Sequence, residues 1–78
     1  MSDIDKISGL VCNLAHIAEL NPDDVIYDVG FTSMAALQLL IEMETEFDVT
    51  IPDDRFIAAR TVRELYNLVD ELREGVPA

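Results

Sequence analysis

The sequence predicts an all-α fold, a small four-helix bundle with three main helices and one short helix. Apolar residues recur at every third or fourth position in three separate segments, which is the spacing of one helical face. Cap and breaker signals bound these segments, including Asn21-Pro22 and a Thr-x-x-Glu capping box at Thr61. The 78 residues, half of them apolar, suffice for one modest core, so residues 1–78 are predicted to form a single domain.

The first helix is predicted to begin at Ser2 and to end at Asn21-Pro22. Ser2 can cap the helix, with Asp5 three positions later as a weak capping box. The residue before a proline is pushed out of helical geometry, which places the end of the helix at Asn21. His16 lies off the apolar face and is expected to be solvated. The expected buried face consists of Ile4, Ile7, Val11, Leu14 and Ala18.

A loop over residues 22–32 is predicted to lead into a second helix from Ser33 to about Phe47. The acids of the loop do not have the spacing of an EF-hand, which excludes a calcium site of that type. The first half of the helix is apolar on nearly every side, which is typical of a central helix with neighbours all round. Its expected buried stripe is Met34, Leu37, Leu40, Ile41 and Phe47. The apolar loop residues expected to seat on the core are Val25, Ile26, Val29 and Phe31.

A short third helix is expected over Asp53 to Ala59, anchored by Phe56 and Ile57. The last helix has the clearest bounds. Thr61 and Glu64 form its capping box, and Gly75 followed by Pro77 is a stop signal. Its expected buried stripe is Val62, Leu65, Leu68, Val69 and Leu72.

The net charge of −11 is unevenly distributed, because residues 1–54 contain twelve acids and a single base. Such a chain is a poor match for nucleic acid phosphates. The excess negative charge has two explanations. It can steer basic protein partners toward the chain, or it can simply keep a small protein in solution. The acids at the end of the second helix oppose its dipole, which favours a docking surface over a merely solvated face. These acids are Glu42, Glu44, Glu46 and Asp48.

Cysteine usage and hydropathy favour a cytoplasmic location and argue against membrane binding. The chain is also expected to be a monomer. A lone Cys12 cannot form an internal disulfide and fits a reducing compartment. The N-terminus lacks the basic and apolar regions of a secretory signal. The longest apolar run is far shorter than the ~20 residues of a membrane span.

The residue types needed for catalysis or metal binding are missing from the neighbourhood of Ser33 in the sequence. The only histidine is His16, the only lysine is Lys6, and there is no phosphate loop, paired-cysteine spacing or nucleophile elbow. The chain is therefore predicted to be a non-enzyme without a metal site. On spacing alone, Ser33 could be a plain N-cap.

The motif Asp28-x-Gly30-x-x-Ser33-Met34, followed by Leu37, Phe47, Val49 and Ile51-Pro52, resembles the acyl carrier protein family. The resemblance covers almost the whole chain. It implies that a phosphopantetheinyl transferase attaches 4′-phosphopantetheine from coenzyme A to Ser33, flanked by the motif residues Asp28, Gly30, Thr32 and Met34. The thiol of this arm would carry cargo as a thioester. A phosphodiester there would lie at a helix N-terminus, which favours anions.

Two departures from fatty-acid carriers bear on the cargo. Those carriers usually have Asp before the serine, where this chain has Thr32, and they place acids where this chain has Ala35, Ala36 and Gln38. The resemblance therefore implies a discrete acyl carrier of a specialised pathway, such as polyketide synthesis. The alternative is an aminoacyl or peptidyl carrier of the nonribosomal or D-alanyl type, loaded by an adenylation enzyme.

The same resemblance implies partners and further sites. The partners would be the transferase, an acyl- or aminoacyl-loading enzyme, and downstream synthase or transferase enzymes with basic surfaces. Six residues could line a cavity for cargo, but ordinary core packing is the favoured explanation. The expected docking residues are Met34, Gln38, Glu42, Glu44 and Thr45. The candidate cavity residues are Met34, Ala35, Leu40, Ile57, Val62 and Leu65.

Overall fold

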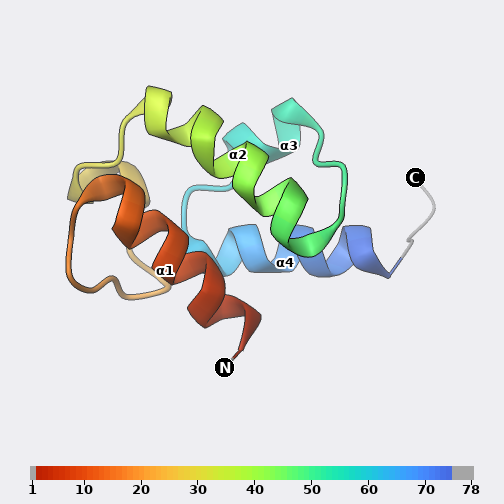
Figure 1. The fold of residues 1–78 in the computed structure, drawn as a ribbon, viewed down its shortest axis with the longest axis horizontal. Coiled ribbons are helices and arrows are strands. Elements are labelled where there is room, and N and C mark those ends of the chain that lie inside the picture. The colour runs from red at the N-terminus through yellow and green to blue at the C-terminus, as the bar shows by residue number, and fades with distance from the viewer. Residues whose placement is uncertain (1, 75–78) are drawn as a thin grey trace.

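The computed structural model describes residues 2–74 and confirms an all-α fold (Figure 1). Four α-helices are joined by loops, and a short 3-10 helix interrupts the longest loop. Within the described residues the only extended pairing is an isolated bridge between Val25 and Thr61. The elements are α1 (Asp3–Ala15), η1 (Ile26–Val29), α2 (Ser33–Phe47), α3 (Asp53–Ala58) and α4 (Val62–Arg73).

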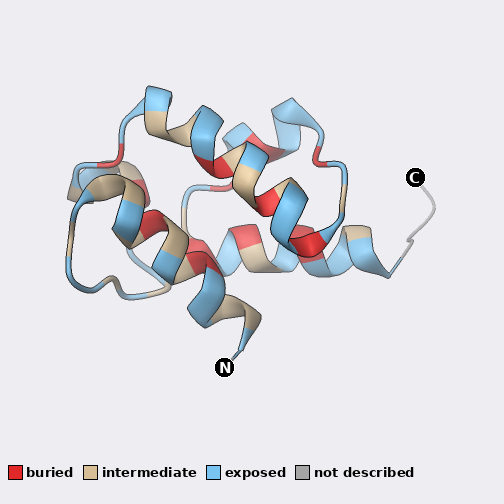
Figure 2. Cartoon of the chain, in the orientation of Figure 1, coloured by how far each residue is buried: buried red, intermediate tan, exposed pale blue. Residues whose placement is uncertain are grey.

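The helices pack around one core. α1 contacts both α2 and α4, and α3 contacts α4. Figure 2 shows buried positions on the facing sides of these helices and exposed positions on the outside. No polar or charged residue is buried within residues 2–74. The core consists of Ile7, Val11, Ile26, Phe31, Leu39, Met43, Phe47, Ile51, Phe56, Ala59, Val62, Leu65, Leu68 and Val69.

α1 begins as predicted but ends earlier than the sequence indicated. Ser2 caps it, since its hydroxyl accepts a hydrogen bond of 3.2 Å from the Asp5 amide. The helix stops at Ala15 because His16 turns into the left-handed region, at φ 59°, and donates its N–H to the Cys12 carbonyl. Histidine is one of the residues that tolerate this conformation. The predicted end at Asn21 was therefore wrong, and Ala18 lies exposed in the loop.

α2 has the predicted ends, but its buried face is a different one. Leu39, Met43 and Phe47 are buried. Met34, Leu37 and Ile41, which were expected in the stripe, are 83%, 66% and 62% exposed. Apolar residues surround the first half of this helix, so contact with its neighbours selects the buried side. The expectation that α2 is central and covered all round was wrong, because one apolar face remains open to solvent.

α3 is one residue shorter than expected and has one anchor instead of two. Phe56 is buried, whereas Ile57 is 69% exposed, so the prediction for Ile57 was wrong. Of the loop residues expected on the core, Ile26 and Phe31 are buried, and Val25 and Val29 are half-buried.

α4 closely follows the sequence prediction. The Thr61 hydroxyl accepts the Glu64 amide at 3.1 Å, and the Glu64 carboxylate accepts the Arg60 amide at 2.9 Å. Four of the five predicted core positions are buried, and Leu72 is half-buried. The predicted stop signal at Gly75 and Pro77 lies outside the described residues. Across residues 2–74, every helix is too short or too polar to traverse a bilayer.

Candidate functional site

The loop that precedes α2 is fastened to the start of α4. The Ile26 amide donates to the Arg60 carbonyl at 2.9 Å, and the Arg63 amide donates to the Pro22 carbonyl at 3.0 Å. These bonds bring the loop around Tyr27 next to the segment between α3 and α4. The position of Ser33, at the end of this loop, is therefore fixed by backbone bonds between residues that lie 34 and 41 positions apart in the sequence.

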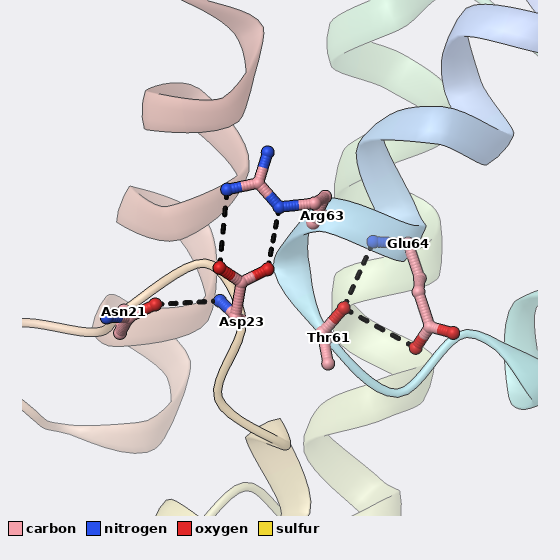
Figure 3. Close-up of polar contacts among 5 residues, drawn as sticks. All are labelled: Asn21, Asp23, Thr61, Arg63 and Glu64. Carbon is pink, nitrogen blue, oxygen red and sulfur yellow. Dashed lines mark hydrogen bonds and ion pairs between the residues drawn. The ribbon is translucent and has the colours of Figure 1, made fainter.

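An ion pair reinforces this attachment (Figure 3). Arg63 Nε lies 2.6 Å from Asp23 Oδ1, and Arg63 Nη2 lies 3.4 Å from Asp23 Oδ2. The Asn21 side chain orients the loop by accepting the Asp23 amide at 2.9 Å. The hydrogen bond from Arg63, together with its charge, lowers the pKa of Asp23. The same contact raises the pKa of Arg63. Both groups are exposed, so the pair fixes geometry more than it adds stability.

The motif around Gly30 turns the chain from η1 into α2. Gly30 has φ 104°, in the left-handed region that glycine adopts at no steric cost, and its N–H donates to the Ile26 carbonyl. Phe31 then enters the core with 3% of its surface exposed. Asp28 lies in η1 with an exposed side chain that forms no hydrogen bond or ion pair within residues 2–74. The turn thus anchors the chain two residues before Ser33.

Thr32, and not Ser33, caps α2. The Thr32 hydroxyl accepts a hydrogen bond of 3.1 Å from the Ala35 amide. Ser33 is the first helical residue, it is exposed, and its hydroxyl has no hydrogen-bond partner in the described part of the chain. The interpretation of Ser33 as a plain N-cap was therefore wrong. Its hydroxyl is available for chemistry without any loss of a structural contact.

The start of α2 is suited to an anion. The amides of Ser33 and Met34 have no acceptor among residues 2–74, as is usual for the first turn of a helix. The first turn also contains no acidic residue. Unpaired amides at a helix N-terminus favour a phosphate or a similar group. The residues therefore fit a phosphodiester on the Ser33 hydroxyl. No metal-binding group of three or more ligands occurs within the described residues.

A pocket of about 440 Å³ opens beside Ser33 between α2, α3 and their loops. This volume is within the range of small-molecule sites. Of the predicted cavity residues, Leu40 and Ile57 line it, whereas Val62 and Leu65 are fully buried in the core. Met34 and Ala35 are not part of its wall. The lining residues are Tyr27, Ser33, Ala36, Leu37, Leu40, Asp53, Phe56, Ile57 and Arg60.

The predicted docking residues have different environments. Met34, Gln38 and Thr45 are exposed, although the Thr45 hydroxyl also donates to the Ile41 carbonyl at 3.0 Å. The Glu44 carboxylate accepts the Ile51 amide at 2.9 Å and so holds the loop after α2. Glu42 is half-buried, and its Oε2 is buried without a hydrogen-bond partner in residues 2–74. These two acids are therefore less available to a partner than the sequence indicated.

An apolar surface that sequence reasoning missed lies next to Ser33. It consists of Met34, Leu37 and Ile41, at positions i, i+3 and i+7 of α2, together with Ile57 of α3. The hydropathy pattern could not reveal it, because the same residues fit the periodicity of a buried stripe. We refer to these four residues as the apolar surface.

Known proteins resemble this chain in sequence and in fold. A stretch of 46 residues is 35% identical to "Probable acyl carrier protein" of Caulobacter vibrioides, covering 59% of this chain and 54% of that protein. A stretch of 49 residues is 39% identical to "Aminoacyl carrier protein 1" of Bradyrhizobium diazoefficiens, covering 63% of this chain and 54% of that protein. The chain thus spans about half the length of these two curated relatives.

A solved structure shares the fold at 18% sequence identity, with a TM-score of 0.86 over 99% of this chain and 75% of that one. It is the solution structure of a non-covalent extended docking domain complex of the Pax NRPS, PaxA T1-CDD/PaxB NDD.

The fold and site define a small helical protein that offers one unpaired serine hydroxyl at the start of its second helix. The chain belongs to the PP-binding family, described as the phosphopantetheine attachment site, which matches residues 5–69. Its cofactor is covalent 4′-phosphopantetheine, and the chain is a phosphopantetheine-binding carrier protein. The resemblance to acyl carrier proteins is thereby confirmed at the level of the family.

Proposed function

We propose that Ser33 is the residue to which 4′-phosphopantetheine is attached. The observation that carries this proposal is the division of roles between two neighbouring hydroxyls. Thr32 is engaged as the helix cap, and the exposed Ser33 hydroxyl has no partner among residues 2–74. The family match over residues 5–69 includes this position.

The attachment requires a separate enzyme, a phosphopantetheinyl transferase, because no base hydrogen-bonds the Ser33 hydroxyl in the described residues. Ser33 Oγ forms the bond to the phosphorus next to pantetheine in coenzyme A. The pyrophosphate bond breaks, adenosine 3′,5′-bisphosphate leaves, and the hydroxyl proton passes to the transferase. The chain contributes an accessible nucleophile and two first-turn amides that favour the anionic product.

The three residues that directly precede Ser33 hold it in place. Gly30 supplies the left-handed turn, Phe31 fixes the loop in the core, and Thr32 sets the first residue of the helix. When bound, the prosthetic group supplies a thiol on a flexible arm, to which cargo is attached as a thioester. The protein then needs no catalytic residue of its own, and its remaining task is to be recognised by several enzymes in turn.

We further propose that enzymes recognise the apolar surface together with the exposed Gln38 and Thr45. Exposed apolar side chains beside the modified serine can enter shallow pockets of a partner. The acidic field of the chain increases the rate of encounter with basic enzymes such as the transferase and the loading enzyme. Glu42 and Glu44 were part of the predicted docking set, but their half-buried carboxylates contribute mainly through this field.

The proposed cargo is an acyl intermediate of a specialised pathway such as polyketide synthesis. The first turn of α2 lacks acids, which supports a carrier distinct from those of fatty-acid synthesis. An aminoacyl cargo is the second candidate. It is supported by the 39% identity to an aminoacyl carrier protein of Bradyrhizobium diazoefficiens.

Intact-mass measurement tests the attachment site. The wild-type chain, treated with coenzyme A and a transferase, should gain the mass of one phosphopantetheinyl group. Ser33→Ala should gain nothing, and the matched control Ser8→Ala, on α1, should be modified like the wild type. A wild-type chain that stays unmodified, or a Ser33→Ala chain that is modified, would refute the assignment.

A further inference from the structure

Arg60 differs from every other lysine and arginine that the structure describes. Each of the other four has a carboxylate partner: Lys6 with Glu46 at 3.8 Å, Arg55 with Glu71, Arg63 with Asp23 at 2.6 Å, and Arg73 with Asp3 at 2.6 Å. Arg60 has no carboxylate within 4 Å in residues 2–74. The chain has sixteen acids and five Lys and Arg residues, so carboxylates are in large excess. A side chain that stays unpaired under these conditions is available to another anion.

Arg60 lies at the pocket beside Ser33. Both residues contribute to the pocket wall. The Arg60 guanidinium carbon lies 5.9 Å from the centroid of the Tyr27 ring, within the range of a cation–π contact. Tyr27 is itself held edge-on against Phe31, with ring centroids 5.8 Å apart. The aromatic contacts therefore orient the guanidinium without using its hydrogen-bond donors.

The backbone of Arg60 is fixed on the same segment that positions Ser33. Its carbonyl accepts the Ile26 amide, and its amide donates to Glu64, both at 2.9 Å. These bonds do not involve the side chain, so replacing the guanidinium leaves the local backbone contacts intact. Arg60 is also exposed, which makes substitutions there compatible with folding.

We infer that Arg60 pairs with the phosphodiester that joins the arm to Ser33, and that it positions the arm along the pocket. This inference rests on the proposed attachment at Ser33. Guanidinium groups bind phosphate oxygens through two parallel N–H donors. Among residues 2–74, Asp53 is the only carboxylate in the pocket wall and Arg60 the only cation. Without Arg60, a phosphodiester would add a second negative charge to a mostly apolar pocket with nothing to balance it.

The test compares apo and holo forms of the wild type, Arg60→Gln, Arg60→Lys and the control Arg55→Gln. Arg55→Gln removes the same charge from a residue outside the pocket wall. In the holo proteins, the ³¹P resonance should move in Arg60→Gln and stay at the wild-type position in Arg55→Gln. Attachment should also lower the Tm of Arg60→Gln more than that of the wild type. A difference of about 1 to 8 °C is expected for an exposed ion pair in a domain of this size. Arg60→Lys should recover most of the Tm difference, because it retains the charge.

Intact mass and peptide mapping of each holo sample separate the two proposals. A chain that does not acquire the group at Ser33 refutes the proposed attachment site. If Ser33 is modified but Arg60→Gln matches Arg55→Gln in both its ³¹P resonance and its apo-to-holo change in Tm, the pairing with Arg60 is refuted and the attachment site stands.

Discussion

Replacing Thr32 with alanine removes the hydroxyl that accepts the Ala35 amide at 3.1 Å and caps α2. Replacing Ser33 with alanine, one position later, removes a hydroxyl with no partner among residues 2–74. The two substitutions delete similar groups from adjacent exposed positions. They therefore isolate the structural role of one hydroxyl from the chemical role of the other.

Loss of a threonine cap lowers the free energy of unfolding by about 1 kcal/mol, within a range of roughly 0.5–2 kcal/mol. Exposed substitutions without such a contact usually stay within about 0.5 kcal/mol, and alanine is the better helix former. Thr32→Ala should therefore lower the Tm by about 4 to 8 °C, and Ser33→Ala by much less.

Urea unfolding of both apo variants, followed by circular dichroism, measures these free energies directly. Phosphopantetheine attachment should distinguish the two variants in the opposite sense. Thr32→Ala should still accept the group, and Ser33→Ala should not. The reasoning fails if Ser33→Ala destabilises the apo protein as much as Thr32→Ala does, because Ser33 would then have a structural contact.

Three further predictions concern the turn, the apolar surface and acid stability. Gly30→Ala should lower the unfolding free energy by about 1–2 kcal/mol through its φ of 104° alone, since an added Cβ meets no atom within 4 Å; a thermal melt without change would contradict this. Leu39→Ala should cost about 2–5 kcal/mol, while Leu37→Ala should leave the Tm nearly unchanged and slow modification by the transferase; equal losses of stability would contradict the assigned faces. Arg63 lowers the pKa of Asp23, so the pair stabilises the fold fully above about pH 4 and is lost as the pH falls through the lowered pKa. Asp23→Asn should therefore destabilise the protein at pH 7, and the difference in Tm from the wild type should vanish in acid; a difference independent of pH would contradict the pair.

The parts of the fold that could be predicted are those encoded by local signals. Thr61 and Glu64 bound α4 through a capping box, and that helix has the predicted buried face. The bounds of α2 followed from the turn at Gly30 and the change of pattern after Phe47. In each case the residues that set the boundary lie within a few positions of it, so no knowledge of the rest of the fold was needed.

The errors arose where several solutions satisfied the same local pattern. α1 could end at Asn21-Pro22 or earlier, and only the left-handed conformation of His16 decides it. α2 is apolar nearly all round, so periodicity could not tell the buried Leu39 from the exposed Leu37. Contacts with neighbouring helices determine which face of α2 is buried, and the face left exposed is the apolar surface.

The sequence could predict which segment carries the site, but it could not predict how the residues of the site are arranged in space. The sequence offered Ser33 as a plain N-cap, whereas Thr32, one residue earlier, caps α2, and helix ends read from sequence vary by one or two residues. Nothing in the sequence indicated Arg60, since its importance depends on lying at the same pocket as Ser33 and on having no ion-pair partner in residues 2–74. Glu44 was assigned to a partner but bonds the Ile51 amide of its own chain.

Peptide mapping by tandem mass spectrometry of the protein isolated from its own host tests the central claim most directly. The account predicts a phosphopantetheinyl group on the peptide that contains residues 32–34, with fragment ions that assign it to Ser33 and leave Thr32 unmodified. A group on any other residue, or a chain that carries none after treatment with coenzyme A and a transferase, would contradict it.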